Sequence, residues 1–225
     1  MNVAAAGAVF AVHGVEGRGK AVFRKSLKRA QVVMFFANLE PCLIGMEACG
    51  SAHYWARKLT VLGHSVKLMA PQFVKPYVKT NKNDAANAEA IREAVSRPNM
   101  RFVPIKTIEG QAVLAFHRRR QGFAKARTAQ ANQIRGLLSE FGLVIPQGIA
   151  SIAKRIPRIL KDAESGLPDT LRALVARLAT YLKELDCQVD ELEAQIQAWH
   201  RQNAQSQRLA DMPSIGPITA TVVGW

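Results

Sequence analysis

A repeat of apolar residues near the end of the chain most strongly constrains its fold. Between residues 171 and 199, apolar side chains recur at alternating spacings of four and three. This period places them along one side of a helix roughly 40 Å long. Such a seam needs a second helix to cover it, so the pattern predicts a coiled coil or a helical hairpin, with a helix packed inside a globular core as the alternative. The seam consists of Leu171, Val175, Leu178, Leu182, Leu185, Val189, Leu192, Ile196 and Trp199.

Two partners for the seam remain open at this point. One is the same helix of a second copy, which would make the chain a homo-oligomer through residues 171–199, and the other is an earlier helical stretch at residues 110–141. Four acidic residues fall mostly off the seam, and we interpret them as solvated charge: Asp186, Asp190, Glu191 and Glu193.

The chain is strongly basic, and its positive charge is concentrated in the middle. It has 31 Lys and Arg against 17 Asp and Glu, for a net charge of +14; residues 111–165 hold 10 basic and 3 acidic side chains, whereas residues 166–225 hold 5 and 7. This excess indicates a polyanionic partner, with nucleic acid as the first candidate. We expect contacts with the phosphate backbone of DNA or RNA, and pairing of some arginines with the acidic last helix is the alternative. The predicted nucleic-acid-binding residues are Arg118, Arg119, Arg120, Lys125, Arg127 and Arg135, in a stretch without acidic residues, and Lys79 and Lys82 in an earlier loop.

The composition also disfavours several classes of protein. Cys42, Cys49 and Cys187 have no C-x-x-C spacing and are expected to be reduced thiols of a cytoplasmic protein. The five histidines are scattered, which argues against a zinc site. No apolar run approaches the roughly 20 residues of a membrane span, and the apolar start of the chain is interpreted as a strand rather than a signal peptide.

The first hundred residues alternate between strand and helix patterns. Two or three short antiparallel strands are expected within residues 3–27, a buried strand at 42–46, a helix at 52–62, a strand at 64–69 and a helix from 84 to about 96. Apolar strands that alternate with helices predict an α/β fold whose sheet is partly parallel and covered by helices. Ligand-binding groups in such sheets gather at the carboxyl ends of the strands, where Glu47 is expected.

A candidate metal site combines Glu47 with the start of the last of these helices, which reads NKNDAANAEA at residues 81–90. Asp84 and Asn87 are three residues apart and share one face of that helix. Two carboxylates at that spacing would suit a divalent cation, but here the second residue is a neutral amide. The pattern therefore indicates a carboxylate metal site with parts missing, and an N-cap aspartate beside a surface glutamate is the alternative.

The chain closes with LADMPSIGPITATVVGW. Residues 213–217, followed by an apolar helical start, resemble the hairpin of a helix-hairpin-helix, which directs backbone N–H groups toward a phosphate. The second helix has barely begun at Trp225, so we expect a chain that ends inside a domain.

Four runs of sequence together resemble a known family. They are GMEACGSAHYWARKL, LMAPQFVKPYVKTNKNDAANAEAI, RTAQANQIRGLLSEFG and MPSIGPITA. The chain that carries them is similar to the transposases of bacterial insertion sequences with a DEDD motif, the Piv/MooV-like group, which are regarded as bridge-RNA-guided recombinases. The similarity is continuous from about Val9 to Trp225.

This resemblance implies a fold, partners and a cofactor. It implies a ribonuclease-H-like (RuvC-like) domain at residues 1–106, a basic long helix and coiled coil at 107–205, and the start of a truncated C-terminal transposase domain with a helix-hairpin-helix at 206–225. DNA and a structured guide RNA are the implied partners, Mg²⁺ is the implied cofactor, and the bacterial cytoplasm is the implied location. The family's nucleophilic serine is expected beyond Trp225, and Ser214 takes the place of the hairpin's usual first glycine.

Only two of the family's four acidic residues are present in this chain. Glu47 and Asp84 match the second and third positions, as catalytic and metal-binding residues, whereas Ala4 and Asn87 stand at the first and fourth. Two carboxylates would hold one Mg²⁺ weakly and are too few for two. We therefore expect an insertion-sequence transposase, a site-specific DNA recombinase, in a truncated and catalytically inactive copy. The alternatives are a non-catalytic nucleic-acid-binding and dimerisation module of the same fold, and a Holliday-junction resolvase-like nuclease, which the heptad and the hairpin disfavour.

Overall fold

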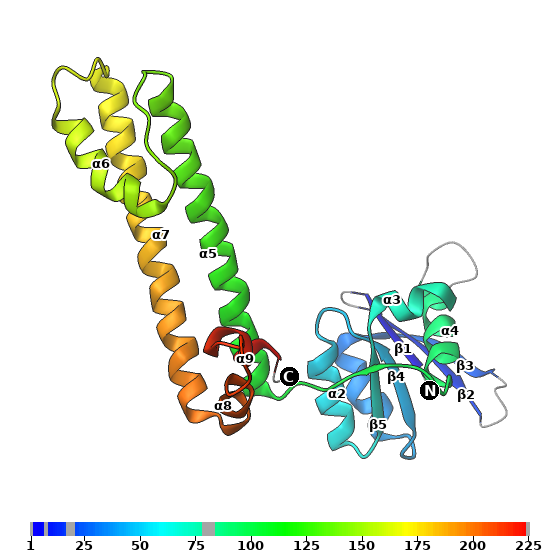
Figure 1. The fold of residues 1–225 in the computed structure, drawn as a ribbon. Coiled ribbons are helices and arrows are strands. Elements are labelled where there is room, and N and C mark those ends of the chain that lie inside the picture. The colour runs from blue at the N-terminus through cyan, green and yellow to red at the C-terminus, as the bar shows by residue number, and fades with distance from the viewer. Residues whose placement is uncertain (1, 7–8, 17–20, 78–83, 224–225) are drawn as a thin grey trace. The chain divides into compact units, whose positions relative to one another are not determined.

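The computed structural model describes the backbone of residues 2–6, 9–16, 21–77 and 84–223, and the side chains of residues 10–16, 22–77 and 88–222. The chain divides into two compact units, Met1–Lys106 and Thr107–Trp225 (Figure 1). The first unit contains the sheet and the second consists of helices, so each is described separately. No helix among the described residues is both long enough and apolar enough to cross a membrane.

The first unit is built on a mixed sheet, which has six strands in the described part of the chain. Their order is β3-β2-β1-β4-β5-β6. β1, β2 and β3 form an antiparallel meander, β1, β4 and β5 run parallel, and β6 pairs antiparallel with β5. The predicted α/β class and the partly parallel sheet are confirmed. The strands are β1 Asn2–Ala6, β2 Val9–Val15, β3 Ala21–Lys28, β4 Leu43–Glu47, β5 Ser65–Met69 and β6 Phe102–Val103.

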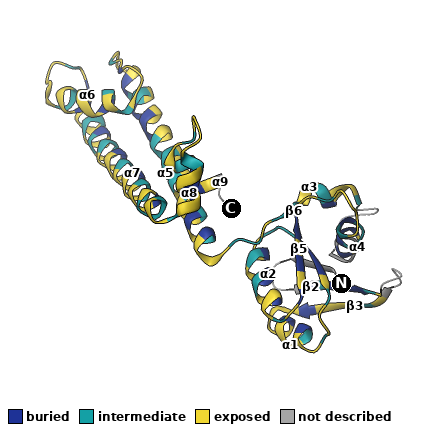
Figure 2. Ribbon diagram, turned by 60° about the horizontal axis from the view of Figure 1, so that its bottom comes forward, coloured by how far each residue is buried: buried dark blue, intermediate teal, exposed yellow. Residues whose placement is uncertain are grey.

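Helices cover both faces of this sheet. Alternate side chains of each strand point to opposite faces, so both faces present apolar side chains to the helices. On one face, Ile44 and Leu68 pack with Trp55 of α2. On the other face, Met69 packs with Ile91 of α4. Figure 2 shows buried residues in the central strands, whereas β3 is largely exposed. The helical segments of the unit are η1 Arg29–Gln31, α1 Val32–Ala37, α2 Ala52–Val61, α3 Pro71–Val74, η2 Lys75–Tyr77 and α4 Asp84–Val95.

Local signals in the sequence explain where some of these elements end. Gly63 follows α2 with a φ of +91°, a conformation that favours glycine, and its N–H donates to the Thr60 carbonyl at 2.9 Å. The predicted stop of this helix at Gly63 is therefore confirmed. The two-residue strand β6 was not predicted, because so short a segment before Pro104 carries no readable period.

The second unit is organised around α5 and α7, which lie side by side and run in opposite directions (Figure 1). Five seam residues of α7 are buried, and part of the seam packs in one apolar cluster with Ile134 and Leu138 of α5. The partner of the seam is thus the earlier helix of the same chain. This packing does not support a homo-oligomer through residues 171–199, which stays a prediction. The helices are α5 Ile108–Ser139, α6 Ile149–Lys161, α7 Asp169–Gln202, α8 Ala204–Ala210 and α9 Pro217–Val223.

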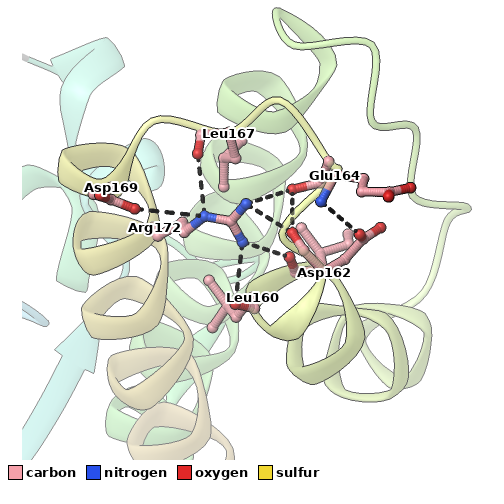
Figure 3. Close-up of polar contacts among 8 residues, drawn as sticks. Leu160, Asp162, Glu164, Leu167, Asp169 and Arg172 are labelled. Atoms are coloured by element: carbon pink, nitrogen blue, oxygen red, sulfur yellow. Dashed lines mark hydrogen bonds and ion pairs between the residues drawn. The ribbon is translucent and has the colours of Figure 1, made fainter.

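Arg172 joins the start of α7 to the end of α6 (Figure 3). Its Nη1 donates to the carbonyls of Ile159 at 3.2 Å and Leu160 at 3.1 Å, and its Nη2 donates to the Asp162 carbonyl at 2.7 Å. Its Nε donates to the Leu167 carbonyl at 3.1 Å. The last carbonyls of a helix have no partner within the helix, so this guanidinium caps α6 and fixes the turn into α7.

A turn at residues 211–216 joins the short helices α8 and α9. Ser214 in this turn has a φ of +69°, which explains why a glycine is usual at this position of the predicted hairpin. Thr221 of α9 lies 2.8 Å from His117 Nε2, so α9 packs back on α5. The assignment of this pair as a helix-hairpin-helix stays a prediction.

Candidate functional site

Glu47 is the last residue of β4, and the strands on either side place two other positions next to it. Val3 of β1 pairs with Met46, so continuing this register by one residue puts Ala4 beside Glu47. On the other side, Glu47 pairs directly with Met69 of β5. The sheet therefore places side by side the two positions that the resemblance assigns to the first and second acidic residues, and the first of them is an alanine.

Helix α4 lies across the face of the sheet that carries Glu47. It packs against β1 and β2 and also contacts β4 and β5, and Met69 is buried beneath it. Residues opposite each other on adjacent strands point to the same face, so the half-buried Glu47 side chain projects toward the face that α4 covers. Asp84 and Asn87 occupy the first turn of α4. Their side chains, and all of Lys79 and Lys82, lie outside the described residues.

The described side chains do not by themselves form a magnesium site. No group of three or more His, Cys, Asp and Glu side chains is arranged to hold a metal ion in the part of the chain whose side chains are described. Close to Glu47 in the sequence is Cys49, whose thiol pKa is raised by burial and by the charge of Glu47. A neutral thiol is a poor ligand for Mg²⁺, which takes hard oxygen donors. Glu47 alone does not fit such a centre, and metal binding by Asp84 stays a prediction.

The predicted basic residues of α5 fall into groups with different surroundings. Arg118, Arg119 and Lys125 are exposed. Arg118 and Lys125 are seven residues apart, so they lie on one side of the helix. The guanidinium carbon of Arg119 lies 3.8 Å from the centre of the Phe123 ring, and a stacked guanidinium keeps its N–H donors at its edge. These three side chains form the exposed basic face of α5.

Arg120 and Arg127 face α7 and form ion pairs there. Arg120 Nε donates to Glu193 at 2.6 Å, and Arg127 Nη1 donates to Asp186. All four side chains are partly buried. The interpretation of Asp186 and Glu193 as solvated charge is therefore wrong, because the register of the two helices sets each acid against an arginine. Pairing of arginines with the last long helix, the predicted alternative, holds for these two residues.

Arg135 supports the loop that leaves α5. Its Nε and Nη2 donate to the carbonyls of Pro146 at 3.2 Å and Gly148 at 2.7 Å. Its Nη1 donates to Asn132 Oδ1 at 3.1 Å. Six basic residues of α5 were predicted to bind nucleic acid. Three of them are thus engaged within the chain, and the other three make up the exposed basic face.

The basic residues of α6 were not among the predicted contacts. Arg155 and Arg158 line an open cavity of about 680 Å³ with Val144 and Asp162, and Arg155 Nη1 donates to the Val144 carbonyl at 3.0 Å. Lys154 and Lys161 are exposed on the same helix. The basic character of residues 149–160 is visible in the sequence. Their arrangement around a cavity depends on the fold of the α5–α6 loop, and the sequence does not reveal that fold.

Comparison with known proteins places the chain in a family. A family model described as a transposase, of the DEDD and IS110 type, matches residues 9–142. A probable family 20 transposase of Pseudomonas aeruginosa is 51% identical over 216 residues, which cover 96% of this chain and 64% of that protein. A putative transposase of Sinorhizobium fredii is 45% identical over 96% of this chain and 55% of its own length.

The transposase for insertion sequence element IS1328 of Yersinia enterocolitica is 42% identical over 95% of this chain and 63% of that protein. The chain thus spans between 55% and 64% of the length of these three relatives. The predicted resemblance is confirmed by these matches. Since the family model covers more than half of the chain, the chain belongs to the DEDD transposase family of the IS110 type.

Proposed function

We propose that this chain is an insertion-sequence transposase that binds nucleic acid but does not cleave DNA. Its membership of the transposase family supports a role in DNA transposition. The proposed absence of DNA cleavage rests on the position of Ala4, which lies beside Glu47 on adjacent parallel strands. At the place where the family resemblance expects a metal-binding carboxylate, the sheet presents a residue whose side chain has no metal-binding atom.

The fold of the first unit supports the ribonuclease-H-like assignment. An antiparallel meander of β3, β2 and β1 continues into the parallel strands β4 and β5, and α4 crosses the face that carries Glu47. In this arrangement Asp84 and Asn87 belong to the first turn of the helix and Glu47 to the end of a strand. The proposed site is therefore assembled from separate elements, as a site shared by several carboxylates requires.

The loss of cleavage follows from the charge needed to hold two cations. Two-metal sites hold their ions roughly 3.5–4 Å apart, and shared carboxylates offset the repulsion between them. Alanine at position 4 supplies no side-chain oxygen, and the side-chain amide of Asn87 supplies an oxygen without charge. Glu47 and Asp84 would then hold one Mg²⁺ weakly, which leaves either the attacking or the departing oxygen without a metal.

Nucleic-acid binding is assigned to the exposed basic face of α5. Arg118, Arg119 and Lys125 offer positive charge away from α7. Contacts of this kind bind phosphates with little reading of sequence. The proposed partners are DNA and a structured guide RNA, both of which present the same phosphate backbone.

The test is to measure binding and cleavage with the same preparation. The chain is incubated with supercoiled donor DNA, guide RNA and Mg²⁺, and bound and nicked products are separated on gels. We expect salt-sensitive binding without strand cleavage. Strand exchange by the unmodified chain would contradict the proposed loss of cleavage, and absence of binding at low salt would contradict the assigned binding function.

A further inference from the structure

His13 of β2 is a buried polar residue that the proposed function does not use. Its exposed fraction is 3%, and neither Nδ1 nor Nε2 has a hydrogen-bond partner among the described residues. A buried polar group without a hydrogen-bond partner destabilises the fold, because it has lost its hydrogen bonds to water. Native folds rarely retain such a group without a bound ligand or water to satisfy it.

The surroundings of His13 provide room for such a ligand. The residue lines a cavity of about 130 Å³ between β2, β3 and α4. A water molecule in the liquid takes up about 30 Å³, so the cavity admits a small polyatomic group. Ala11 and Ala88 leave this space because their side chains are short. The lining residues are Ala11, Val12, His13, Arg24, Lys25, Ser26 and Ala88.

Two further donors line the cavity from β3. Arg24 is the direct partner of His13, and Ser26 is the direct partner of Ala11, so both lie on the same face of the sheet as His13. Lys25 lies between them in sequence, so its backbone borders the cavity while its side chain points to the opposite face. Its ammonium is 5.2 Å from the centre of the Phe35 ring.

The charges around His13 favour an anion over a cation. Burial, and then the charge of Arg24, lower the pKa of His13, with Arg92 contributing in the same direction. The ring is therefore neutral near pH 7 and offers one N–H donor. Glu89 opposes this effect, but its carboxylate lies 3.6 Å from Arg24 in an exposed pair, and such pairs are weak. An incoming anion can therefore displace Glu89 from Arg24 at low cost.

We propose that this cavity binds one phosphate group, with Arg24 supplying the charge and His13 and Ser26 supplying N–H and O–H donors. The cavity opens on the face of the sheet that carries Glu47 and α4. A phosphate of the nucleic-acid backbone that crosses this face would then be held beside the candidate site. The nucleic-acid backbone as the source of the phosphate rests on the proposed function. Free inorganic phosphate presents the same chemical group and is the other source that the experiments distinguish.

The first experiment titrates the ¹⁵N-labelled full chain with inorganic phosphate and follows the ring signals of His13 by NMR. We expect a saturable shift. Arg24→Gln and Ser26→Ala should each weaken binding, the former by about tenfold, because a hydrogen bond to a charged group is lost. Glu89→Gln should strengthen it by releasing Arg24. These three side chains are exposed, so their substitution leaves the core intact.

Lys25→Gln is the matched control, because it removes the same charge from the same strand on the opposite face. It should leave the affinity for phosphate within about twofold, since exposed charges act weakly at this distance. Absence of a shift at His13 would overturn the proposal. Equal losses in Arg24→Gln and Lys25→Gln would overturn it too, because binding would then follow net charge alone.

The second experiment repeats the series with duplex DNA and separates the two sources. Weaker DNA binding by Arg24→Gln than by Lys25→Gln supports a backbone phosphate in the cavity. DNA binding that depends on α5 but not on Arg24 overturns the subsite and leaves the proposed function standing. A His13 shift with inorganic phosphate in a chain that binds no DNA overturns the nucleic-acid source and the proposed function, and supports a free-phosphate site.

Discussion

Arg120 and Glu193 form an ion pair across α5 and α7, and Arg127 and Asp186 repeat it one heptad away. The two arginines are seven residues apart on α5, and the two acids are seven residues apart on α7 in the reverse order. Equal spacing in opposite directions keeps both pairs in one register of an antiparallel helix pair. This register decides which basic residues of α5 remain available to a ligand.

Replacing the exposed basic face should weaken nucleic-acid binding through charge alone. The double variant Arg118→Gln, Lys125→Gln removes two phosphate contacts, and each contact contributes roughly one to the slope of log affinity against log salt. We expect the slope for duplex DNA to fall by about 2 with little change in stability. Fluorescence anisotropy over a series of salt concentrations measures both the affinity and the slope.

The matched control removes the same charge from the other side of the helix. Arg120→Gln with Arg127→Gln breaks both ion pairs with α7 and should lower stability, by about 1 kcal/mol for each partly exposed pair. The salt slope of DNA binding should stay close to that of the parent chain. A larger fall in slope for this control than for the exposed pair would contradict the assignment of the binding face.

Charge within the seam of α7 should unfold the second unit. Leu182 and Leu185 are 4% and 3% exposed, so Leu182→Asp with Leu185→Asp buries two carboxylates without partners. We expect loss of helicity by circular dichroism and loss of cooperative unfolding. Leu174→Asp, at a position that is 41% exposed on the same helix, should be tolerated. Equal helicity in the double variant and the parent would show that the seam is not a packing surface.

Arg172→Ala should destabilise the second unit although the residue lies far from the seam's centre. The guanidinium donates to four backbone carbonyls at the α6–α7 turn. Hydrogen bonds from a charged donor contribute about 1.5–3 kcal/mol, and water replaces part of them at an exposed turn, so we expect a loss of about 2 kcal/mol. Arg177→Ala, at an exposed position of α7, is the control for urea unfolding. A similar loss in both variants would argue against the capping role.

Much of the fold could be predicted because its signals are periodic. The heptad of α7, the glycine after α2 and the apolar strand that ends at Glu47 each depend on short-range sequence alone. The choice between a second copy and α5 as partner of the seam could not be predicted in this way. Both partners satisfy the same apolar stripe, and the α5–α7 connection through α6 decides between them.

The contacts of the candidate sites depend on register, which single residues do not reveal. A signal for the α5–α7 ion pairs was nevertheless present, as two arginines and two acids with the same spacing of seven. For His13, strand alternation groups it with Ala11. Its burial and its missing partners become visible only when α4 covers that face. The position of Ala4 beside Glu47 likewise follows from strand pairing between distant segments.

Acidification should destabilise the second unit through His117. Burial, with the charge of Arg120 second, lowers the pKa of His117 below its ordinary value of 6.5. The Thr221 hydroxyl donates to a carbonyl of its own helix, so neutral His117 donates its Nε2–H to that oxygen. As the pH falls below about 6.5, the unfolded chain takes up the proton first, and stability decreases until the folded form is protonated as well.

Urea unfolding at about pH 7.5 and about pH 5.5 measures this loss. In His117→Gln the amide retains a donor for Thr221 and does not titrate. The difference in stability between the two pH values should therefore be smaller in the variant than in the parent. An equal difference in both chains would assign the pH dependence to other groups.

Restoring the two missing carboxylates should restore metal binding. Ala4→Asp places a carboxylate on the strand position beside Glu47, and Asn87→Asp places a second one a turn from Asp84 on α4. Each added charge lowers the free energy of holding a dication, so calorimetry should detect Mg²⁺ binding at least tenfold tighter than in the parent, about 1.4 kcal/mol. Glu47→Gln in the restored background should abolish this gain, because it removes the carboxylate beside the new one at position 4. Equal Mg²⁺ affinity in the restored and parent chains would show that positions 4 and 87 do not belong to the metal site.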